Sequence, residues 1–85
     1  MNKVFTNIAW DDYLYWQATD KKILKKVNTL IQDIERHGNE GLGKPESLKH
    51  ELGGLWSRRI TLEHRLIYKI DDEQIYILQC RGHYD

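Results

Sequence analysis

Residues 55–81, LWSRRITLEHRLIYKIDDEQIYILQCR, decide the fold of this chain. They contain three runs rich in β-branched and aromatic residues, at 55–60, 64–70 and 75–81, and short polar turns separate these runs. Runs of this length and composition, joined closely along the chain, are typical of strands that pair with their neighbours. This part of the sequence therefore predicts three consecutive antiparallel strands.

The first two runs also predict a pairing register. If residues 61–63 form a symmetric three-residue loop, Arg59 lies opposite Arg65 and Trp56 lies opposite Tyr68. Because side chains alternate across a strand, one face then carries the apolar residues and faces the helices. The apolar face comprises Trp56, Ile60, Leu66, Tyr68 and Ile70, and the other face comprises Arg59, Arg65 and Lys69. Two opposed arginines repel each other by about 0.2–1 kcal/mol, and a phosphate bridging them would replace this repulsion with forked hydrogen bonds.

The beginning of the chain predicts a short strand followed by helical structure. Residues 3–5 are the extended segment, and residues 7–36 have the spacing of a helical hairpin or of one kinked helix. Asn7 is the expected first cap, Thr19 or Asp20 restarts the pattern, and Gly38 is the expected last cap. The buried stripe is expected to contain Trp10, Tyr13, Leu14 and Gln17, and then Ile23, Leu24, Val27, Leu30, Ile31 and Ile34. The opposite side of the second part carries Lys21, Lys22, Lys25, Lys26 and Asp33.

The order of these segments predicts an α+β fold with an N-terminal β-strand and two helices packed on an antiparallel β-sheet. Residues 37–45 are rich in glycine and include a proline, which indicates a loop. Residues 46–52 are too short to assign. A chain of 85 residues is long enough for one compact domain and too short for two, so we expect one domain over residues 1–85.

The composition argues against several classes of protein. Cys80 is the one cysteine, so an intramolecular disulfide is excluded, and we expect a buried thiol in a cytoplasmic protein. No apolar run approaches the roughly 20 residues that a membrane span needs, so no membrane association is expected. The sequence has no CxxC, HxxxH or HExxH motif, and the spacing of Glu46 and His50 is too common to indicate a ligand pair. We therefore expect no metal and no other cofactor.

The charges balance overall but are distributed unevenly. The chain has 13 basic and 13 acidic residues, a formal net charge of zero, which argues against RNA binding through the field of the whole protein. The middle of the chain is nevertheless basic, because six lysines and arginines accompany three glutamates there. These residues are Lys44, Lys49, Arg58, Arg59, Arg65 and Lys69, against Glu46, Glu51 and Glu63. This segment predicts a local site for an anion.

Four strings of the sequence resemble the YoeB toxins of the RelE/ParE superfamily. They are WDDYLYWQATDKK at 10–22, GLGKPESLKHEL at 41–52, GLWSRRITLEHRLIYKI at 54–70 and CRGHYD at 80–85. They resemble, in order, the first helical segment, the central loop, the central hairpin and the C-terminal strand of that family. Two positions differ from the family pattern. Ser47 stands where a second proline is common, and Asp85 follows the tyrosine that is the usual last residue.

The resemblance implies a RelE-like fold and the toxin of a type II toxin–antitoxin system. Such a toxin is a ribosome-dependent endoribonuclease, or mRNA interferase, that cuts messenger RNA in the ribosomal A site and inhibits translation. The implied partners are a cognate YefM-like antitoxin, the ribosome with its messenger RNA, and operator DNA when toxin and antitoxin are bound together. Toxins of this group can also pair as homodimers. The antitoxin would be a disordered segment that folds over the basic face.

By position, the resemblance implies that Glu46 is the general base, His83 the general acid and Arg65 the group that stabilises the phosphorane. The reaction needs no metal: the RNA 2′-hydroxyl attacks the adjacent phosphorus and gives a 2′,3′-cyclic phosphate and a 5′-hydroxyl. The residues that would support the phosphate and the base are Lys49, Arg59, Glu63 and Tyr84.

These residue types suit that chemistry. A carboxylate can accept the proton of the 2′-hydroxyl, and histidine, with an ordinary pKa of about 6.5, can give one to the leaving oxygen. Each such group contributes roughly 10²–10⁴-fold when it is within hydrogen-bond reach. An arginine binds two phosphoryl oxygens in a planar fork, and stacking of a tyrosine on a base contributes about 1–3 kcal/mol.

Each residue also has a simpler interpretation. Without the resemblance, Glu46 would be a solvated carboxylate, His83 an exposed histidine, and Arg65 a partner of Glu63 or Asp72 across the sheet. Among the other residues, the three tryptophans are expected in the core, and two histidines are expected to be structural or peripheral. The tryptophans are Trp10, Trp16 and Trp56, and the histidines are His50 and His64.

Two other functions stay open from the sequence. One is a module without catalytic activity that binds antitoxin and nucleic acid and acts in operator repression. The other is a ribonuclease that needs no ribosome. The presence of Glu46, Arg65 and His83 counts against the first, and the zero net charge, which gives little grip on free RNA, counts against the second.

Overall fold

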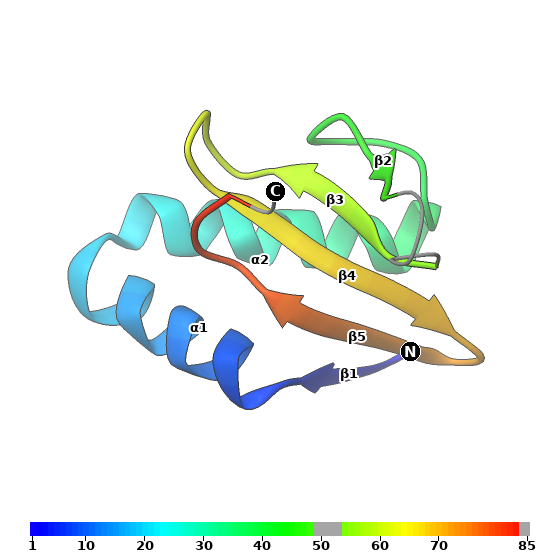
Figure 1. Cartoon of the computed structure of the whole chain (residues 1–85), viewed down its shortest axis with the longest axis horizontal. Helices are drawn as coiled ribbons and strands as arrows, with labels where there is room; N and C mark the ends of the chain where they lie inside the picture. The colour runs from blue at the N-terminus through cyan, green and yellow to red at the C-terminus, as the bar shows by residue number, and fades with distance from the viewer. Residues whose placement is uncertain (49–53, 84–85) are drawn as a thin grey trace.

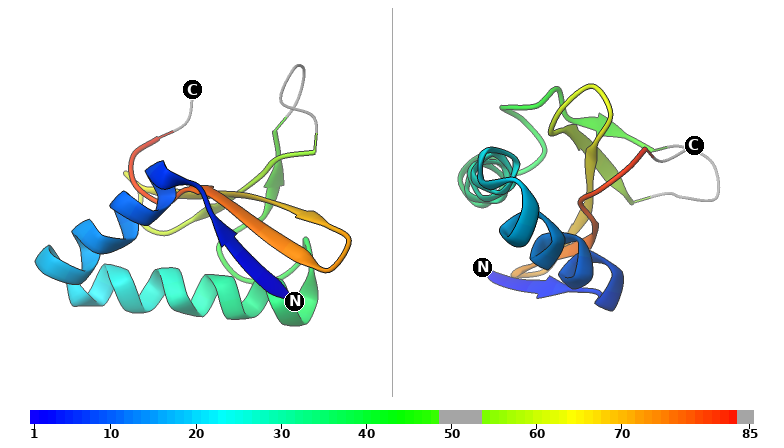
Figure 2. Two further views of the ribbon diagram at one scale, coloured as in Figure 1. Left: turned by 90° about the horizontal axis from the view of Figure 1, so that it is seen from below. Right: turned by 90° about the vertical axis from the view of Figure 1, so that its left-hand side faces the viewer.

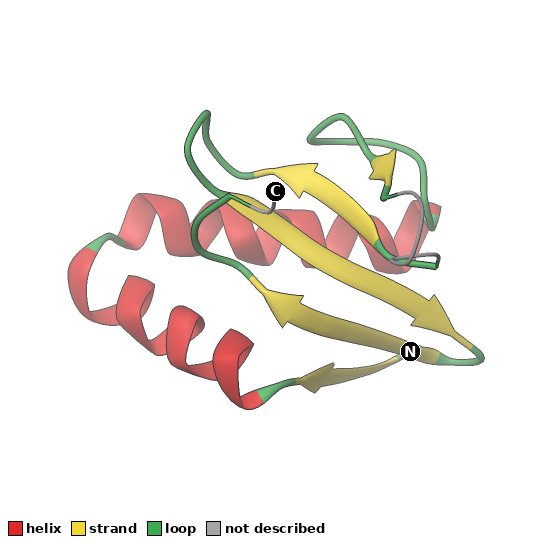
Figure 3. Cartoon of the chain, in the orientation of Figure 1, coloured by secondary structure: helices red, strands yellow, loops and turns green. Residues whose placement is uncertain are grey.

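The computed structural model describes residues 1–48 and 54–83. The elements are β1 (Asn2–Phe5), α1 (Asn7–Thr19), α2 (Lys21–His37), β2 (Glu46–Ser47), β3 (Trp56–Arg59), β4 (Arg65–Asp71) and β5 (Gln74–Gln79). Figures 1 and 3 show these elements, and Figure 2 shows that both helices lie on one side of the sheet. The predicted α+β fold, with a first strand and two helices packed on a sheet, is confirmed.

The sheet has the order β1-β5-β4-β3-β2. The pairs β3–β4 and β4–β5 are antiparallel, as predicted. The pair β2–β3 is antiparallel as well, and β1 pairs with β5 in parallel. A parallel pair needs a long connection between its strands, and the two helices and the central hairpin supply it. The sheet is therefore mixed, and β2, in a segment that the sequence pattern left unassigned, forms its other edge.

The predicted register of the central hairpin is confirmed. Arg59 pairs with Arg65, and Trp56 pairs with Tyr68. On the face towards the helices, Leu66 and Tyr68 are fully buried, and Ile70 packs against the core. The predicted division into an apolar face and a basic face therefore holds for these residues.

The helix ends are set by side chains that accept backbone N–H groups. Thr6, not Asn7, caps α1: its Oγ1 accepts a hydrogen bond from the amide of Ala9 at 3.0 Å. Asp20 caps α2 by accepting from the amides of Lys22 and Ile23. Such a cap satisfies amides that have no partner inside the helix. Residues 7–19 and 21–37 therefore form two separate helices, and Gly38 is the C-cap of α2, as predicted.

The predicted buried stripe of α1 is wrong for Trp10, Leu14 and Gln17, which are exposed, and holds for Tyr13, which packs against the core. Ala9 and Trp16 are buried, whereas Trp10 is 48% exposed and Leu14 is 40% exposed. Aromatic residues occur all around this helix, so the hydrophobic pattern does not distinguish one face from another. The inner face also carries a polar residue, Asp12, whose carboxylate accepts a hydrogen bond from the amide of Cys80.

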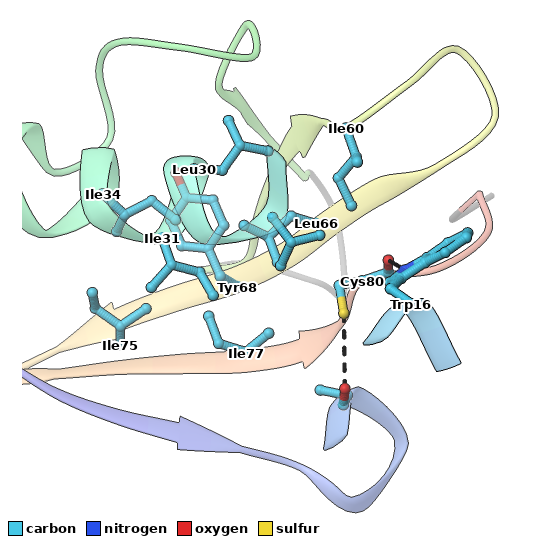
Figure 4. Packing of buried hydrophobic residues seen from close by; sticks show 12 residues of the cluster. Trp16, Leu30, Ile31, Ile34, Ile60, Leu66, Tyr68, Ile75, Ile77 and Cys80 are labelled. Atoms are coloured by element: carbon cyan, nitrogen blue, oxygen red, sulfur yellow. Dashed lines mark hydrogen bonds between the residues drawn. The ribbon is translucent and has the colours of Figure 1, made fainter. Parts of the chain in front are cut away.

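The core lies between α2 and the sheet (Figure 4). The buried stripe of α2 contains Val27, Leu30, Ile31 and Ile34, as predicted, and it packs with residues of β4 and β5. Cys80 is fully buried at the edge of this core, and burial raises the pKa of its thiol to about 12. The expectation of a buried thiol is confirmed.

Arg58 lies on the buried face of β3 together with Trp56 and Ile60, although its charge placed it among the basic residues of the predicted anion site. Its side chain is fully buried and forms an ion pair with Asp33, whose side chain is only 11% exposed. Two expectations are therefore wrong: Arg58 is not part of an exposed anion site, and Asp33 does not lie with the solvated lysines of α2. A buried charge requires a partner because its desolvation costs several kcal/mol, and Asp33 is that partner.

The guanidinium of Arg58 organises the loop that follows α2. Nη1 donates to the Asp33 carboxylate and to the Leu42 carbonyl, Nη2 donates to the carbonyls of Gly38 and Glu40, and Nε donates to the Tyr68 hydroxyl. These five acceptors match the five N–H donors that a guanidinium carries. The loop thus wraps around one buried side chain.

Two glycines permit this close wrapping. A Cβ atom at Gly41 would overlap the Asp33 carboxylate, and one at Gly43 would lie 3.0 Å from the Arg59 carbonyl. Both residues also have positive φ angles, of 116° and 78°, which residues with a Cβ rarely adopt. The glycines of this loop are therefore explained by the approach of the loop to Asp33 and β3.

Among residues 1–48 and 54–83, neither helix has the length and apolar character that crossing a membrane requires.

We predict that Asp33→Asn lowers the free energy of unfolding by up to about 3–5 kcal/mol, because it leaves the buried Arg58 without a counter-charge. The hydrogen bonds from the Leu42 amide and the Arg58 guanidinium hold the pKa of Asp33 below its ordinary value of 3.8. A group with a lowered pKa stabilises the fold above its unfolded pKa, and this stabilisation is lost as the pH falls through the folded pKa. Urea unfolding at neutral pH and at about pH 3 should therefore show a weaker acid dependence in the variant.

The matched control for Asp33→Asn is Glu35→Gln. Glu35 also has a lowered pKa, because Lys3 and the N-terminal amine bind it, but this pair is at the surface. The control should change stability much less. Equal effects of the two substitutions would contradict the role assigned to Asp33.

Candidate functional site

A cleft of about 210 Å³ is lined in part by Arg59 and Arg65, which lie on the face of the hairpin opposite to Leu66 and Tyr68. Its lining residues come from the loop before β2, from β2 and β3, from the start of β4 and from the C-terminal segment. They are Lys44, Glu46, Leu48, Ser57, Arg59, Arg65 and His83. All three residues that the resemblance implies are catalytic, Glu46, Arg65 and His83, therefore lie around one cleft.

The pairing of β2 with β3 positions Glu46. In this antiparallel pair Glu46 lies opposite Ser57, so their side chains share a face. Ser57 and Arg59 are two residues apart on β3 and share that face as well. The loop before β2 is also bound directly to β3. The amide of Arg59 donates to the carbonyl of Gly43, three residues before Glu46, at 2.7 Å.

The β3–β4 hairpin places Arg59 and Arg65 side by side. They are directly paired in the register, so their side chains leave the backbone on the same face of the hairpin. The guanidinium of Arg65 donates through Nη1 to the carbonyls of Thr61, Leu62 and His64, at 2.6, 3.1 and 3.2 Å. It is held by its own turn, and it is not paired with Glu63 or Asp72.

His83 reaches the cleft from the segment after β5. Its Nε2 lies 3.2 Å from the carbonyl oxygen of Leu62, one of the oxygens that also bind Arg65. The side chain of His83 is exposed, so it is open to a ligand in the cleft. One carbonyl of the β3–β4 turn is therefore in contact with two groups of the site.

The remaining candidates divide into three groups. Arg59 lines the cleft, whereas Glu63 lies in the β3–β4 turn and does not belong to the lining residues. Lys49 and Tyr84 fall outside the described residues. Lys44, one of the basic residues of the predicted anion site, also lines the cleft. Sequence reasoning missed Ser57 and Leu48 as lining residues, although the predicted register implied the place of Ser57, which shares a face with Arg59. The backbone at Lys44 has a positive φ of 49°, which no sequence pattern indicated.

The cleft combines groups of opposite chemical character. A carboxylate can accept a proton, an imidazole can give or accept one, and two guanidinium groups can bind the oxygens of a phosphate. This set can support proton transfer at a phosphoryl centre. Within residues 1–48 and 54–83, the structure brings together no group of three or more His, Cys, Asp or Glu residues that could hold a metal ion.

A larger groove of about 610 Å³ lies elsewhere, between β1, α1 and α2. Phe5, Trp10 and Tyr13 line it, and the rings of Trp10 and Tyr13 are stacked with their centroids 5.8 Å apart. The expectation that Trp10 belongs to the core is wrong, because it forms a wall of this open groove. The expectation holds for Trp16, which is buried, and Trp56 is partly buried against the core.

We predict that the cleft binds inorganic phosphate through Arg59 and Arg65. In NMR titrations at constant ionic strength, phosphate should shift the amide signals of Ser57, Arg59 and Arg65. Arg59→Gln should weaken this binding several-fold, because it removes one of two adjacent guanidinium groups. The control is Arg36→Gln in the last turn of α2, which should leave binding unchanged. A titration in which Arg36→Gln weakens binding as much as Arg59→Gln would rule out a local site.

The sequence and the fold were compared with those of known proteins. Residues 5–84 match the family model described as YoeB-like toxin of bacterial type II toxin–antitoxin system. The toxin YoeB of Escherichia coli strain K12 is 57% identical over 84 residues, which cover 99% of this chain and 100% of that protein.

Two solved structures from Staphylococcus aureus are similar over nearly the whole chain. The first, described as a YoeB dimer, has 50% sequence identity and a TM-score of 0.94, and the alignment covers 99% of this chain and 98% of that one. The second, described as a YoeB–YefM complex, has 49% identity and a TM-score of 0.92 with the same coverage.

Proposed function

Because this chain belongs to the YoeB-like toxins of bacterial type II toxin–antitoxin systems, we propose that it is an endoribonuclease that cleaves messenger RNA in the ribosomal A site. Cleavage there stops translation of the message. The observation that supports this proposal is that Glu46, Arg65 and His83 line one cleft although they come from distant parts of the chain. These three residues supply a base, a cation and an acid, which transesterification of RNA requires.

The proposed reaction proceeds without a metal. Glu46 accepts the proton of the 2′-hydroxyl, and the 2′-oxygen forms a bond to the adjacent phosphorus. The bond from phosphorus to the 5′-oxygen breaks, and His83 in its protonated form gives a proton to that oxygen. The products are a 2′,3′-cyclic phosphate and a 5′-hydroxyl.

The two arginines would bind the charge that develops on phosphorus. Arg65 uses Nη1 for the carbonyls of its turn, and no described residue accepts from its Nη2 or Nε. These remaining donors can bind phosphoryl oxygens from a fixed position. A cation held in place before the reaction lowers the barrier because it need not reorganise. Arg59, directly opposite in the register, would bind the same phosphate, and this would relieve the repulsion between the two arginines.

The partners of the toxin follow from the family and from the charge of the cleft. A YoeB from Staphylococcus aureus forms a complex with YefM, and we infer that a cognate antitoxin of that type binds this chain and covers the basic cleft. A second Staphylococcus aureus YoeB structure is a dimer, and a homodimer is part of the proposal. Operator DNA would be bound only by the toxin–antitoxin complex. The proposed location is the cytoplasm, where the ribosomes are.

The main alternative is a module that binds antitoxin and nucleic acid without catalysis. Against it stands the presence of acid, base and cation in one cleft, since a binding module needs the cations alone. A free ribonuclease is the second alternative. The zero net charge provides little long-range attraction for RNA, which favours a toxin that receives its substrate from the ribosome.

We predict that His83→Gln and Arg65→Ala each remove most cleavage while the protein stays folded. Primer extension on a defined message in a purified translation system should show cuts in A-site codons with the wild type. The cuts should fall by at least about 10²-fold in either variant, the size expected for loss of an acid or of a charge-stabilising group. Circular dichroism and thermal unfolding would verify the fold. A folded His83→Gln protein that cuts at the wild-type rate would disprove the role of His83.

We further predict that naked RNA is a poor substrate. The same message without ribosomes should be cut far more slowly at equal toxin concentration, because the protein carries no net positive charge to hold it. The control is Arg65→Ala: any residual cleavage of free RNA that this substitution abolishes comes from the cleft. Rapid, Arg65-dependent cleavage of free RNA would replace the ribosome-dependent mechanism with that of a general ribonuclease.

A further inference from the structure

We propose that His64 is a positioning residue for His83: its imidazole holds the backbone amide of Gly82 and so determines where the chain presents His83. The role as a positioning residue in catalysis rests on the proposed function, since it assumes that His83 acts as an acid. From the sequence, His64 was expected to be structural or peripheral, and its place in the fold is more specific than that.

The contact itself is a hydrogen bond of 2.8 Å from the Gly82 amide to Nδ1 of His64. The Gly82 carbonyl in turn accepts from the amide of Arg65 at 3.0 Å. Both backbone groups of the residue before His83 are therefore bound by two successive residues, the last residue of the β3–β4 turn and the first residue of β4. Because Arg65 is itself a proposed catalytic residue, residues 64 and 65 set the separation between the proposed acid and the proposed cation.

This contact requires one chemical form of His64. An imidazole nitrogen accepts a hydrogen bond only when it carries no proton, so the ring must be neutral with its proton on Nε2. The ring is held in its orientation by Trp16, whose indole meets it edge to face at 4.7 Å between centroids. Trp16 is buried, so the partly buried ring of His64 packs against a fixed side chain.

Helix α1 binds the residues just before Gly82. The Cys80 carbonyl accepts from the indole Nε1 of Trp16 at 2.8 Å, and the Cys80 amide donates to Asp12 at 3.0 Å. The guanidinium of Arg81 lies over the ring of Tyr15 at 3.6 Å. Figure 4 shows the bond between Trp16 and Cys80 at the edge of the core. Residues 80–82 are thus each held in place, and His64 and Arg65 form the last contacts before His83.

The geometry predicts that loss of the acceptor moves His83 without unfolding the protein. His64→Leu keeps a side chain of similar width against Trp16 but removes the acceptor. His64→Asn is the conservative variant, because its carboxamide oxygen occupies the position of Nδ1 on Cγ and can accept from the Gly82 amide. A misplacement of about 1 Å can lower a rate by about 10²-fold, so a positional defect is measurable.

The test is single-turnover cleavage of programmed ribosomes by wild type, His64→Leu, His64→Asn and His83→Gln. We expect His64→Leu to lower the maximal cleavage rate by about 10-fold to 10²-fold and to leave the ribosome concentration at half-saturation nearly unchanged. We expect His64→Asn to recover most of the rate. The control for removing a histidine is His37→Leu at the exposed end of α2, which should cut at the wild-type rate.

A measurement without RNA accompanies the kinetics. In ¹⁵N NMR spectra of the free protein, His64 should show the neutral form with its proton on Nε2. The Gly82 amide signal should shift in His64→Leu and return towards its wild-type position in His64→Asn. The contact on which the proposal depends would be overturned by a His64 ring protonated at Nδ1. It would also be overturned if the Gly82 amide signal kept its wild-type chemical shift in both variants.

The kinetic outcomes separate this proposal from the proposed function. If the wild type does not cut the message, the proposed function fails, and the catalytic role of His64 fails with it. If the wild type cuts, His83→Gln does not, and His64→Leu cuts at the wild-type rate, only the role of His64 is wrong. Equal loss of activity in folded His64→Leu and His64→Asn would also overturn it, because the acceptor would then have no effect.

Discussion

The buried guanidinium of Arg58 is the interaction on which the cleft side of this fold depends. Its five donors bind Asp33, Tyr68 and three carbonyls of the loop after α2. A fully buried cation is tolerated only when every donor finds an acceptor, so the loop has little freedom to take another path. That path leads directly into β2, which aligns Glu46 with Ser57. Helix α2, the sheet and the cleft are therefore joined through one side chain.

The other side of the cleft depends on helix α1 and the β3–β4 turn. Asp12 and Trp16 hold both backbone groups of Cys80, and His64 with Arg65 hold those of Gly82. The contacts within the turn are made mostly with backbone groups, whose positions the hairpin determines. A carboxylate, two guanidinium groups and an imidazole thus surround one cleft although each has a different structural support. A site held by rigid elements can be aligned before its substrate arrives.

Local sequence patterns predicted the elements better than their ends and faces. The apolar stripe of α2 and the hairpin register were predicted, because strict spacing and a three-residue loop leave few alternatives. The stripe of α1 was not, since Trp10 and Leu14 are exposed while Asp12 faces inward to bind Cys80. Thr6 replaced Asn7 as the cap because its hydroxyl accepts from the Ala9 amide. Those outcomes depend on residues more than 60 positions away or on exact backbone direction.

By itself, the sequence determined the α+β class, the register that places Arg59 opposite Arg65, and the motifs that carry the family resemblance. These properties arise from periodicity and from short loops, which act over a few residues. Only the tertiary structure decided that Arg58 is buried against Asp33, that Glu46 and His83 share a cleft with Arg65, and that His64 binds Gly82. The physical reason is that burial and hydrogen-bond partners are set by contacts between distant segments. Arg58 and Arg59 are neighbours in one strand, yet Arg58 is buried in the interior and Arg59 lines the cleft.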